Sequence, residues 1–303
     1  MLNFNVMGMR KTWFVFSGVL ILLGLISLLW PGRGLNLGID FTGGSSFEIL
    51  FEKPVTTSQV RQVLAEFGLE GSSIIQDAQN PADVIVQTRS FKSEEDKQAL
   101  YSALEEKIGP FQELESQDVS PVISRELVKN ALLALLVAGV GILFYVSYRF
   151  EFWFGLAALV ALVHDALITL GFFSLLQVEI GVPFVAAVLT ILGYSINDTI
   201  VVFDRVRENL KSKKKATYEE IANISVRQTF VRSINTSATT LIMVLFLLLV
   251  GGRTIQPFTL AMLIGITAGT YSSIFVATPV WVSIREFLDL RKGRIARVAG
   301  STE

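Results

Sequence analysis

Six long apolar runs recur along the chain, and shorter polar segments separate them. The runs cover residues 13–30, 127–148, 152–176, 182–203, 234–250 and 257–284. Each is close to the length of about 20 residues that an α-helix needs to cross the hydrocarbon core of a bilayer. The pattern therefore predicts a polytopic α-helical membrane protein with six transmembrane helices, the last five of which form a bundle over residues 127–284.

Residues 31–126 have the composition of a soluble domain, and their periodicity changes along the segment. The pattern predicts a strand at 45–53, a helix at 57–69, strands at 72–79 and 82–89, a helix at 93–108 and a strand at 113–120. In this order, βαββαβ, the elements are typical of the split βαβ, or ferredoxin-like, fold. We therefore expect an α+β domain between the first and second membrane helices.

Basic residues near the predicted spans set the expected orientation. They gather in residues 1–12, in the polar segment 204–233, which carries eight lysines and arginines, and in residues 285–303. Because basic loops stay on the cytoplasmic side of a membrane, we expect both termini and a basic loop at 204–233 to be cytoplasmic. Residues 35–126 then lie on the extracytoplasmic side.

The composition supports the membrane assignment and excludes several kinds of functional site. Hydrophobic residues make up 51% of the chain, and the mean hydropathy is +0.53. The absence of cysteine excludes disulfides, thiolate metal sites and cysteine nucleophiles. The single histidine, His164, leaves no histidine cluster for a metal, and the sequence has no phosphate-binding loop. We therefore expect no metal, no cofactor and no use of ATP.

An acidic residue lies inside the fourth apolar run. Asp198 is about 9 Å from the charged end of that run at a rise of about 1.5 Å per residue, and a carboxylate at that depth costs about 2.5–3.5 kcal/mol. The stripe that Asp198 borders is too polar for lipid, so we expect it to face other protein or a water-filled cavity. Its members, which share one helical face, are Thr190, Gly193, Tyr194, Asn197 and Asp204.

A second polar stripe begins at the entry of the fifth apolar run. Arg232, Asn235, Thr236 and Thr239 share one helical face. Arg232 is either an anchor that snorkels to the cytoplasmic interface or a cation that lines the same polar path as Asp198. The hydroxyl-rich stripe favours the second interpretation, because an anchor alone does not require it.

Asp165 lies in the middle of the third apolar run, with small residues on its helical face. It is either a second carboxylate of a proton relay or a hydrogen-bonding group between closely packed helices, and the sequence leaves both open. His164 points about 100° away and is more typical of a packed or interface histidine. In the last run, Gly265, Gly269 and Ser273 indicate close helix packing rather than chemistry.

A buried carboxylate near an arginine is a minimal basis for proton coupling. A conformational change that separates the two takes up a proton, and one that joins them releases it. A proton that crosses a potential of 100 mV supplies about 2.3 kcal/mol, which is enough to bias a two-state element. We therefore predict a proton pathway that contains Asp198, Arg232, Asn197, Asn235, Thr236 and Thr239, with Asp165 as a further candidate.

Three motifs give a more specific indication. They are LGIDFTGG at residues 37–44, GYSINDTIVVFDRVREN at 193–209 and RSINTSATT at 232–240. In this order they resemble the motifs of the SecF family, the smaller half of the bacterial SecD–SecF protein-export complex within the resistance–nodulation–division superfamily. The resemblance covers nearly the whole chain.

The resemblance implies a function and a set of partners. It places Asp198 and Arg232 in a proton pathway that works against an aspartate of a SecD-like subunit. It also implies a multi-pass protein of the bacterial inner membrane whose domain at 35–126 aids unfolded preprotein. The proton-motive force then drives conformational cycling beside the SecYEG channel, with the small membrane protein YajC as an associate. Neither an enzymatic activity nor a nucleic-acid partner is implied.

Three alternatives remain open. The first is half of a proton-coupled small-solute or lipid exporter of the same superfamily, for which the domain at 35–126 is small. The second is an intramembrane aspartyl protease in which Asp165 and Asp198 share a proton, although Asp198 follows Ser-Ile-Asn rather than the usual Gly-x-Gly. The third is a purely structural assembly subunit, which leaves the buried Asp198 unexplained.

Overall fold

The structure, a computed structural model, describes residues 5–77, 80–91 and 93–291. The chain forms two compact units. Leu37–Leu132 make up one, which we call the α+β unit, and the segments up to Asn36 and from Leu133 onward make up the other, the helical unit. Most of the expected basic tail at 285–303 lies outside the described residues, which end at Arg291, and so do the first four residues of the chain.

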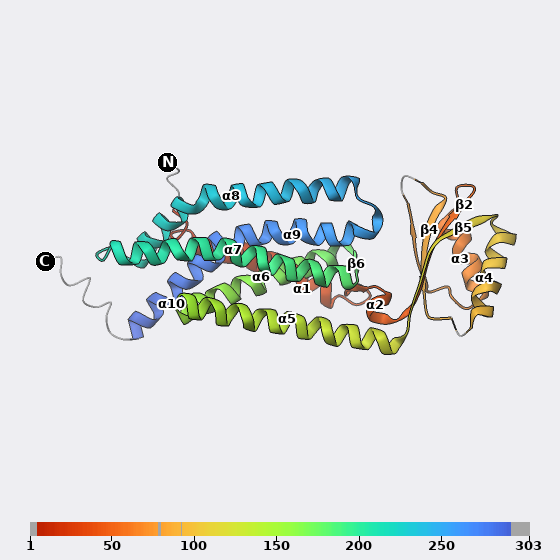
Figure 1. Cartoon of the computed structure of the whole chain (residues 1–303), viewed down its shortest axis with the longest axis horizontal. Helices are drawn as coiled ribbons and strands as arrows, with labels where there is room; N and C mark the ends of the chain where they lie inside the picture. The colour runs from red at the N-terminus through yellow and green to blue at the C-terminus, as the bar shows by residue number, and fades with distance from the viewer. Residues whose placement is uncertain (1–4, 78–79, 92, 292–303) are drawn as a thin grey trace. The chain divides into compact units, whose positions relative to one another are not determined.

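The α+β unit contains its elements in the expected order of strand, helix, strand, strand, helix and strand (Figure 1). The four longer strands form one sheet in the order β3-β4-β2-β5, in which all neighbours are antiparallel. These six elements are β2 (Gly44–Phe51), α3 (Thr57–Glu66), β3 (Ser73–Gln76), β4 (Asp83–Thr88), α4 (Glu94–Lys107) and β5 (Phe111–Val119). Two short elements that the sequence did not predict precede them in the chain, β1 (Asn36–Leu37) and α2 (Ile39–Thr42).

The core of the α+β unit lies between the sheet and its two longer helices. Along β2, the buried residues Phe47, Ile49 and Phe51 alternate with less buried ones, because successive side chains of a strand point to opposite faces. Leu64 of α3 and Leu104 of α4 belong to the same apolar cluster. The helices therefore cover one face of the sheet.

Two glycines end the first sequence motif and turn the chain into β2. Gly43 and Gly44 have positive φ angles of 74° and 142°, a region that only glycine adopts without strain. A Cβ atom on Gly44 would also collide with the carbonyl oxygen of Thr88 on β4. Both the backbone conformation and the close approach of the neighbouring strand therefore require glycine at residue 44.

Six helices among the described residues are long and apolar enough to cross a membrane, as expected. Between them, β6 (Glu179–Ile180) and a short 3-10 turn, η1 (Arg253–Ile255), precede α7 and α9 respectively. The six are α1 (Arg10–Leu29), α5 (Pro121–Arg149), α6 (Phe152–Leu176), α7 (Val182–Ser212), α8 (Tyr218–Val250) and a composite helix of α9 (Gln256–Ser272), η2 (Ser273–Ala277) and α10 (Thr278–Arg291).

Residues 204–233 differ from the expected basic loop. They are mostly helical, because α7 continues to Ser212 and α8 already begins at Tyr218. A capping box starts α8: the amide of Glu220 donates to the Thr217 hydroxyl (3.2 Å), and the amide of Thr217 donates to the Glu220 carboxylate (2.9 Å). Neither proline nor glycine follows until Gly251, so the helix continues into the membrane segment without a break.

The last span also differs from the single helix expected at 257–284. It contains the π-helical turn η2 and continues to Arg291. π turns are rare and occur mostly as single turns within α-helices, frequently at functional sites. Ser272 and Ser273, the last residue of α9 and the first of η2, are both fully buried at this position.

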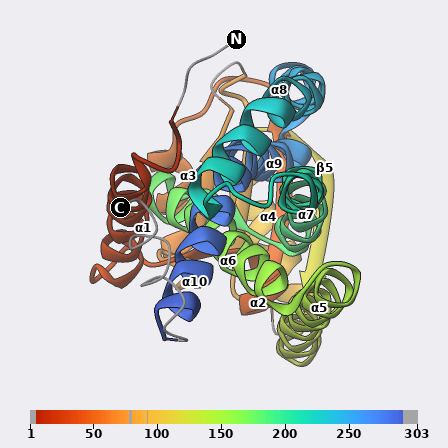
Figure 2. The same cartoon turned by 90° about the vertical axis from the view of Figure 1, so that its left-hand side faces the viewer.

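Within the helical unit, α9 lies among α6, α7 and α8 and contacts all three (Figure 2). The expected close packing occurs here. A Cβ atom on Gly265 would lie 2.6 Å from Cγ1 of Ile191, and one on Gly269 would lie 2.9 Å from Cβ of Ser195, both on α7. The two glycines therefore permit a close contact that brings polar groups of α7 and α9 together.

Candidate functional site

Asp198 lies inside the helical unit, where three helices meet. It is 6% exposed, and its Oδ2 accepts a hydrogen bond of 3.1 Å from the hydroxyl of Ser237 on α8. That hydroxyl in turn accepts a hydrogen bond of 2.6 Å from Thr270 on α9. A row of two hydroxyls therefore connects the carboxylate on α7 to α9 through α8.

A cavity of about 10 Å³ lies beside Asp198. Its size is close to the lower limit of about 10–15 Å³ for one enclosed water molecule. Seven of its eight lining residues carry a hydroxyl, amide or carboxyl group, so it suits a single hydrogen-bonded water. The lining residues besides Asp198 are Tyr194, Ser195 and Asn197 of α7, Thr236 and Ser237 of α8, and Ile266 and Thr270 of α9.

Most of the other expected site residues lie on an outward surface of α7 and α8. Asp198 is at the inner border of this surface, next to Asn197, whereas Thr236 is half-buried. Exposed arginine and asparagine side chains are costly in a membrane, so the surface requires a cover of protein or water. We call it the polar face, and its exposed residues are Thr190, Tyr194, Asn197 and Asp204 of α7 and Arg232, Asn235 and Thr239 of α8.

Arg232 lies on α8 five residues before Ser237, the hydrogen-bond donor to Asp198. Its positive charge is near enough to act on the Asp198 carboxylate. Asp198, Arg232 and the hydroxyl of Ser237 therefore belong to one contact of α7 with α8. The role of these residues in a proton pathway stays a prediction.

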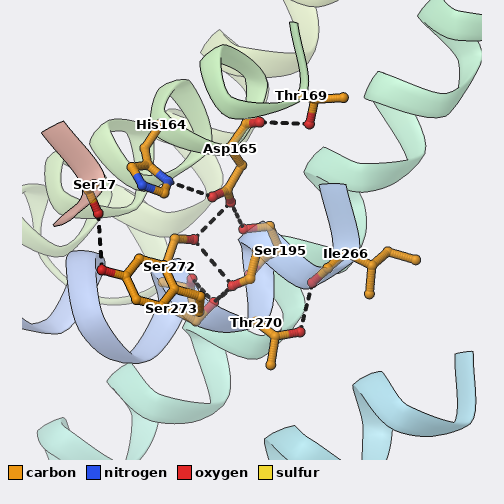
Figure 3. Close-up of polar contacts among 12 residues, drawn as sticks. Ser17, His164, Asp165, Thr169, Ser195, Ile266, Thr270, Ser272 and Ser273 are labelled. Carbon is orange, nitrogen blue, oxygen red and sulfur yellow. Dashed lines mark hydrogen bonds and ion pairs between the residues drawn. The ribbon is translucent and has the colours of Figure 1, made fainter. Parts of the chain in front are cut away.

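Asp165 lies in a separate, fully enclosed cluster (Figure 3). Its Oδ1 is 2.9 Å from Nδ1 of His164, and its Oδ2 accepts hydrogen bonds from Ser195 on α7 (2.6 Å) and from Ser272 on α9 (2.8 Å). We call these four residues the Asp165 cluster. Asp165 and Asp198 thus accept hydrogen bonds from different hydroxyls, which is not the shared-proton geometry of an aspartyl protease pair.

His164 occupies the packed position that its place on the helix indicates. It is 6% exposed, and its ring faces that of Tyr271 with centroids 6.0 Å apart. The hydroxyl of Tyr271 lies 3.1 Å from that of Ser17 on α1. Among the described residues, Nε2 of His164 is buried without a hydrogen-bond partner. The position of the His164 ring is therefore explained by packing against Tyr271, and Nδ1 of the ring is paired with Asp165.

Three hydroxyl residues of the two sites, Ser195, Thr270 and Ser272, are absent from the residues that the sequence indicates. Serine and threonine are common at packed interfaces of membrane helices, so their presence alone predicts no site. The signal that reveals two of them is the stretch TAGTYSS at 267–273, which concentrates four hydroxyl residues and a tyrosine in an otherwise apolar run.

A further contact joins α7 to α8 away from Asp198. The side-chain amide of Asn209, which is 5% exposed, donates to Ser225 (2.9 Å) and to Gln228 (2.9 Å) on α8. Arg205 also donates to the Gln228 side chain at 2.7 Å. The helix α8 is therefore held against α7 at two levels, around Ser225 and around Ser237.

Together, the fold and the site define a class of protein. It is a multi-pass membrane protein with an α+β unit between its first two spans and a buried carboxylate among hydroxyl groups. No group of three or more histidine, aspartate and glutamate side chains in the described part of the chain could hold a metal ion.

Comparison with known families places the chain within that class. The family described as protein export membrane protein SecD/SecF, C-terminal, matches residues 100–287, and the SecD/SecF GG motif matches residues 28–55. The chain belongs to the SecD/SecF family of protein-export membrane proteins.

Relatives with curated names match over most of the chain. The protein translocase subunit SecF of Sebaldella termitidis is 39% identical over 289 residues, which are 94% of this chain and 93% of the relative. SecF of Pseudomonas aeruginosa is 39% identical over 283 residues, 92% of each chain. The protein translocase subunit SecDF of Bacillus subtilis is 38% identical over 277 residues, 90% of this chain but 37% of the relative.

A solved structure agrees with these matches. The crystal structure of SecDF, a translocon-associated membrane protein, from Thermus thermophilus has a TM-score of 0.85 and a sequence identity of 39%. The match covers 93% of this chain and 39% of that one. The chain is therefore similar to SecF proteins over nearly its full length and to one part of the longer SecDF proteins.

Proposed function

We propose that this chain is the SecF-like subunit of a proton-driven SecD–SecF complex that assists preprotein translocation through the SecYEG channel from the extracytoplasmic side. The family and the names of its relatives support the role in translocation. The observation that carries the proton-driven part is Asp198, a carboxylate that is 6% exposed beside a cavity of about 10 Å³ at the border of the polar face.

The proposed mechanism follows from the charges around Asp198. In the ionised state, the carboxylate accepts the charge-assisted hydrogen bond of Ser237 and attracts Arg232. Protonation removes the charge, so both interactions weaken and α8 is released from α7 at the level of Ser237, while the contact at Asn209 remains. A membrane potential of 100 mV supplies about 2.3 kcal/mol per proton, which biases the equilibrium between the two states. The proposed polar path for the proton runs between Asp198 and the exposed polar face, and its residues are Asn197, Asn235, Thr236 and Thr239.

The polar face supports a SecD-like subunit as the direct partner. This chain corresponds to 37% of the Bacillus subtilis SecDF protein, so the remainder of such a protein is available to cover the face. A partner that contributes its own acidic or hydroxyl groups would satisfy the exposed Arg232 and Asn235. SecYEG and a YajC-like protein are the further partners that we propose for the assembled complex.

The α+β unit is the proposed extracytoplasmic part, with a ferredoxin-like fold. Its strand order β3-β4-β2-β5 with intervening helices supports this fold. The basic segments near the other ends of the spans support cytoplasmic termini in a bacterial inner membrane. We propose that this unit receives unfolded preprotein, which site-specific crosslinking of residues 35–126 to a stalled preprotein tests. Failure of that crosslink at every exposed position would contradict the proposal.

Replacement of Asp198 by asparagine tests the proton-driven role, because it keeps the shape of the side chain and removes its charge. In membrane vesicles that contain the channel and the complete complex, Asp198→Asn should abolish the part of preprotein translocation that depends on the proton gradient. Translocation without a gradient should stay unchanged. The matched control is Glu208→Gln, which removes an exposed carboxylate of the same helix and should behave like the wild type. Full gradient dependence in Asp198→Asn would refute the proposal.

A further inference from the structure

The two buried carboxylates reach the same short segment of α9 from different sides. Asp165 accepts a hydrogen bond from Ser272, and Asp198 is linked through Ser237 to Thr270. Thr270 and Ser272 are two residues apart, at the end of α9 just before the π turn η2. The position of this segment therefore affects both carboxylates.

The spacing of α7 and α9 determines whether Ser237 can make both of its hydrogen bonds. Its hydroxyl donates to Asp198 on α7 and accepts from Thr270 on α9. The bond to Asp198 is 3.1 Å long, already at the upper end of the usual range of about 2.5–3.0 Å for bonds between two oxygens. A small displacement of α9 from α7 would therefore break one of the two bonds and leave the hydroxyl of Ser237 unable to bridge the helices.

Asp165 is the group that holds this spacing from the opposite side. One oxygen of its carboxylate accepts from Ser195 on α7 and from Ser272 on α9, and its other oxygen is beside His164 on its own helix. A single enclosed carboxylate thus joins α6, α7 and α9.

The π turn adds a second connection between the same two helices. The hydroxyl of Ser273 donates to the backbone carbonyl of Ser195 (3.2 Å), and it lies 2.9 Å from the hydroxyl of Thr199 (Figure 3 shows Ser273 and its neighbours). Thr199 is adjacent to Asp198 in the chain. Ser273 therefore contacts two points on α7, Ser195 and Thr199, which are about one turn apart, and Asp198 lies on the turn between them.

We infer that Asp165 is a positioning residue: it fixes α7 against α9 through Ser195 and Ser272, and so sets the distance between Asp198 and Thr270 that Ser237 spans. The inference deepens the proposed function and rests on it for the meaning of Asp198. It assigns Asp165 a role that needs its hydrogen-bonding oxygens, whereas a proton relay needs a group that gains and loses a proton.

Asparagine and alanine at residue 165 separate these two roles. The amide oxygen of Asp165→Asn, in the place of Oδ2, still accepts from both serine hydroxyls, and its amino group lies beside Nδ1 of His164, which accepts in the neutral ring. We expect this variant to keep gradient-dependent translocation within about twofold of the wild type and to keep its pH profile. Asp165→Ala removes both links, and we expect a loss of about tenfold or more. A loss in Asp165→Asn as complete as that in Asp198→Asn would overturn the inference.

A second measurement covers the case in which Asp165→Ala does not fold. Ser272→Ala removes only the link to α9, and we expect a partial loss that is not additive with Ser237→Ala, because both changes act on the same bridge. Additive losses would contradict the inference, since they would mean that the two serines act independently.

Hydrogen exchange in the complete complex makes the inference testable apart from the proposed function. Peptides that cover residues 265–273 should exchange faster in Asp165→Ala or Ser272→Ala and at the wild-type rate in Asp165→Asn. This result would support the positioning role even if Asp198→Asn had no effect on translocation. An Asp198→Asn variant with no effect would refute the proton-driven function alone. Equal exchange in all variants would overturn the positioning role.

Discussion

The contact of Gly265 with Ile191 gives a direct test of how tightly α7 and α9 are packed. A Cβ atom at residue 265 would lie 2.6 Å from Cγ1 and 2.8 Å from Cγ2 of Ile191, whereas carbon atoms in favourable contact are about 3.5–4.0 Å apart. Ile191 is 1% exposed, so its side chain has no open space to enter. Gly265→Ala therefore forces α9 about 1 Å away from α7 or forces Ile191 out of its rotamer, at a cost of about 1–3 kcal/mol.

The same displacement reaches the proposed proton site. Gly265 and Thr270 belong to one helix, and the hydrogen bond from Thr270 to Ser237 is 2.6 Å long. A shift of α9 by about 1 Å would lengthen it beyond the usual range of about 2.5–3.0 Å. We therefore expect Gly265→Ala to reduce both the free energy of unfolding and gradient-dependent translocation.

The assay is an unfolding titration of the full chain with sodium dodecyl sulfate in mixed micelles. Ile191→Ala alone should cost about 2–5 kcal/mol, because it leaves a cavity. The double variant should be more stable than the sum of the single effects by about 0.5–3 kcal/mol, because the smaller side chain makes room for the new methyl group. Gly139→Ala on α5, where a Cβ would meet nothing within 4 Å, is the control and should not destabilise the protein. Strictly additive effects, or an unchanged Gly265→Ala, would refute the reasoning.

Two further predictions concern the α+β unit. Leu104 is fully buried in the core of this unit, so Leu104→Ala should destabilise the unit by about 2–5 kcal/mol. Hydrogen exchange should accelerate in peptides from residues 44–119 but not in peptides from the helical unit. Equal acceleration in both units would contradict this prediction. Burial, assisted by the negative charge of Glu113, raises the pKa of Tyr101 above its ordinary value of about 10. The folded unit thus holds the phenol proton more tightly than the unfolded chain, so the stability that this proton contributes is complete below about pH 10 and is lost as the pH rises toward the folded pKa. In a pH titration followed by tyrosinate absorbance, one phenol should ionise at a higher pH than the others, and Tyr101→Phe should remove that step. Ionisation of the Tyr101 phenol near pH 10 would contradict the prediction.

The spans and the order of elements in the α+β unit are predictable because their signals are local. An apolar run long enough to cross a bilayer, or the alternation of Phe47, Ile49 and Phe51, is visible without knowledge of neighbouring helices. The ends of α7 and α8 are not predictable from hydropathy. Hydropathy marks where the membrane begins. The capping box at Thr217 instead decides where α8 begins, and the absence of a helix-breaking residue lets it continue into the membrane segment.

The candidate site divides in the same way. Asp198 and Arg232 are conspicuous in the sequence because a charge in an apolar run is costly wherever its partners lie. The partners of Asp165 are not conspicuous, because Ser195 and Ser272 lie on other helices and meet it only through the way those helices cross. Gly265 and Gly269 indicate that a close crossing exists, but not which helix α9 contacts.

The continuous helix α8 has a mechanical consequence for any motion that starts at Ser237. It is held against α7 at Ser225, 12 residues before Ser237, and it ends at Val250, 25 residues after Ser225. At a rise of about 1.5 Å per residue, Ser237 is about 18 Å and Val250 about 37 Å from that fixed point. The helix is thus a lever with its pivot near Asn209, and it amplifies a small displacement beside Asp198 about twofold at its far end.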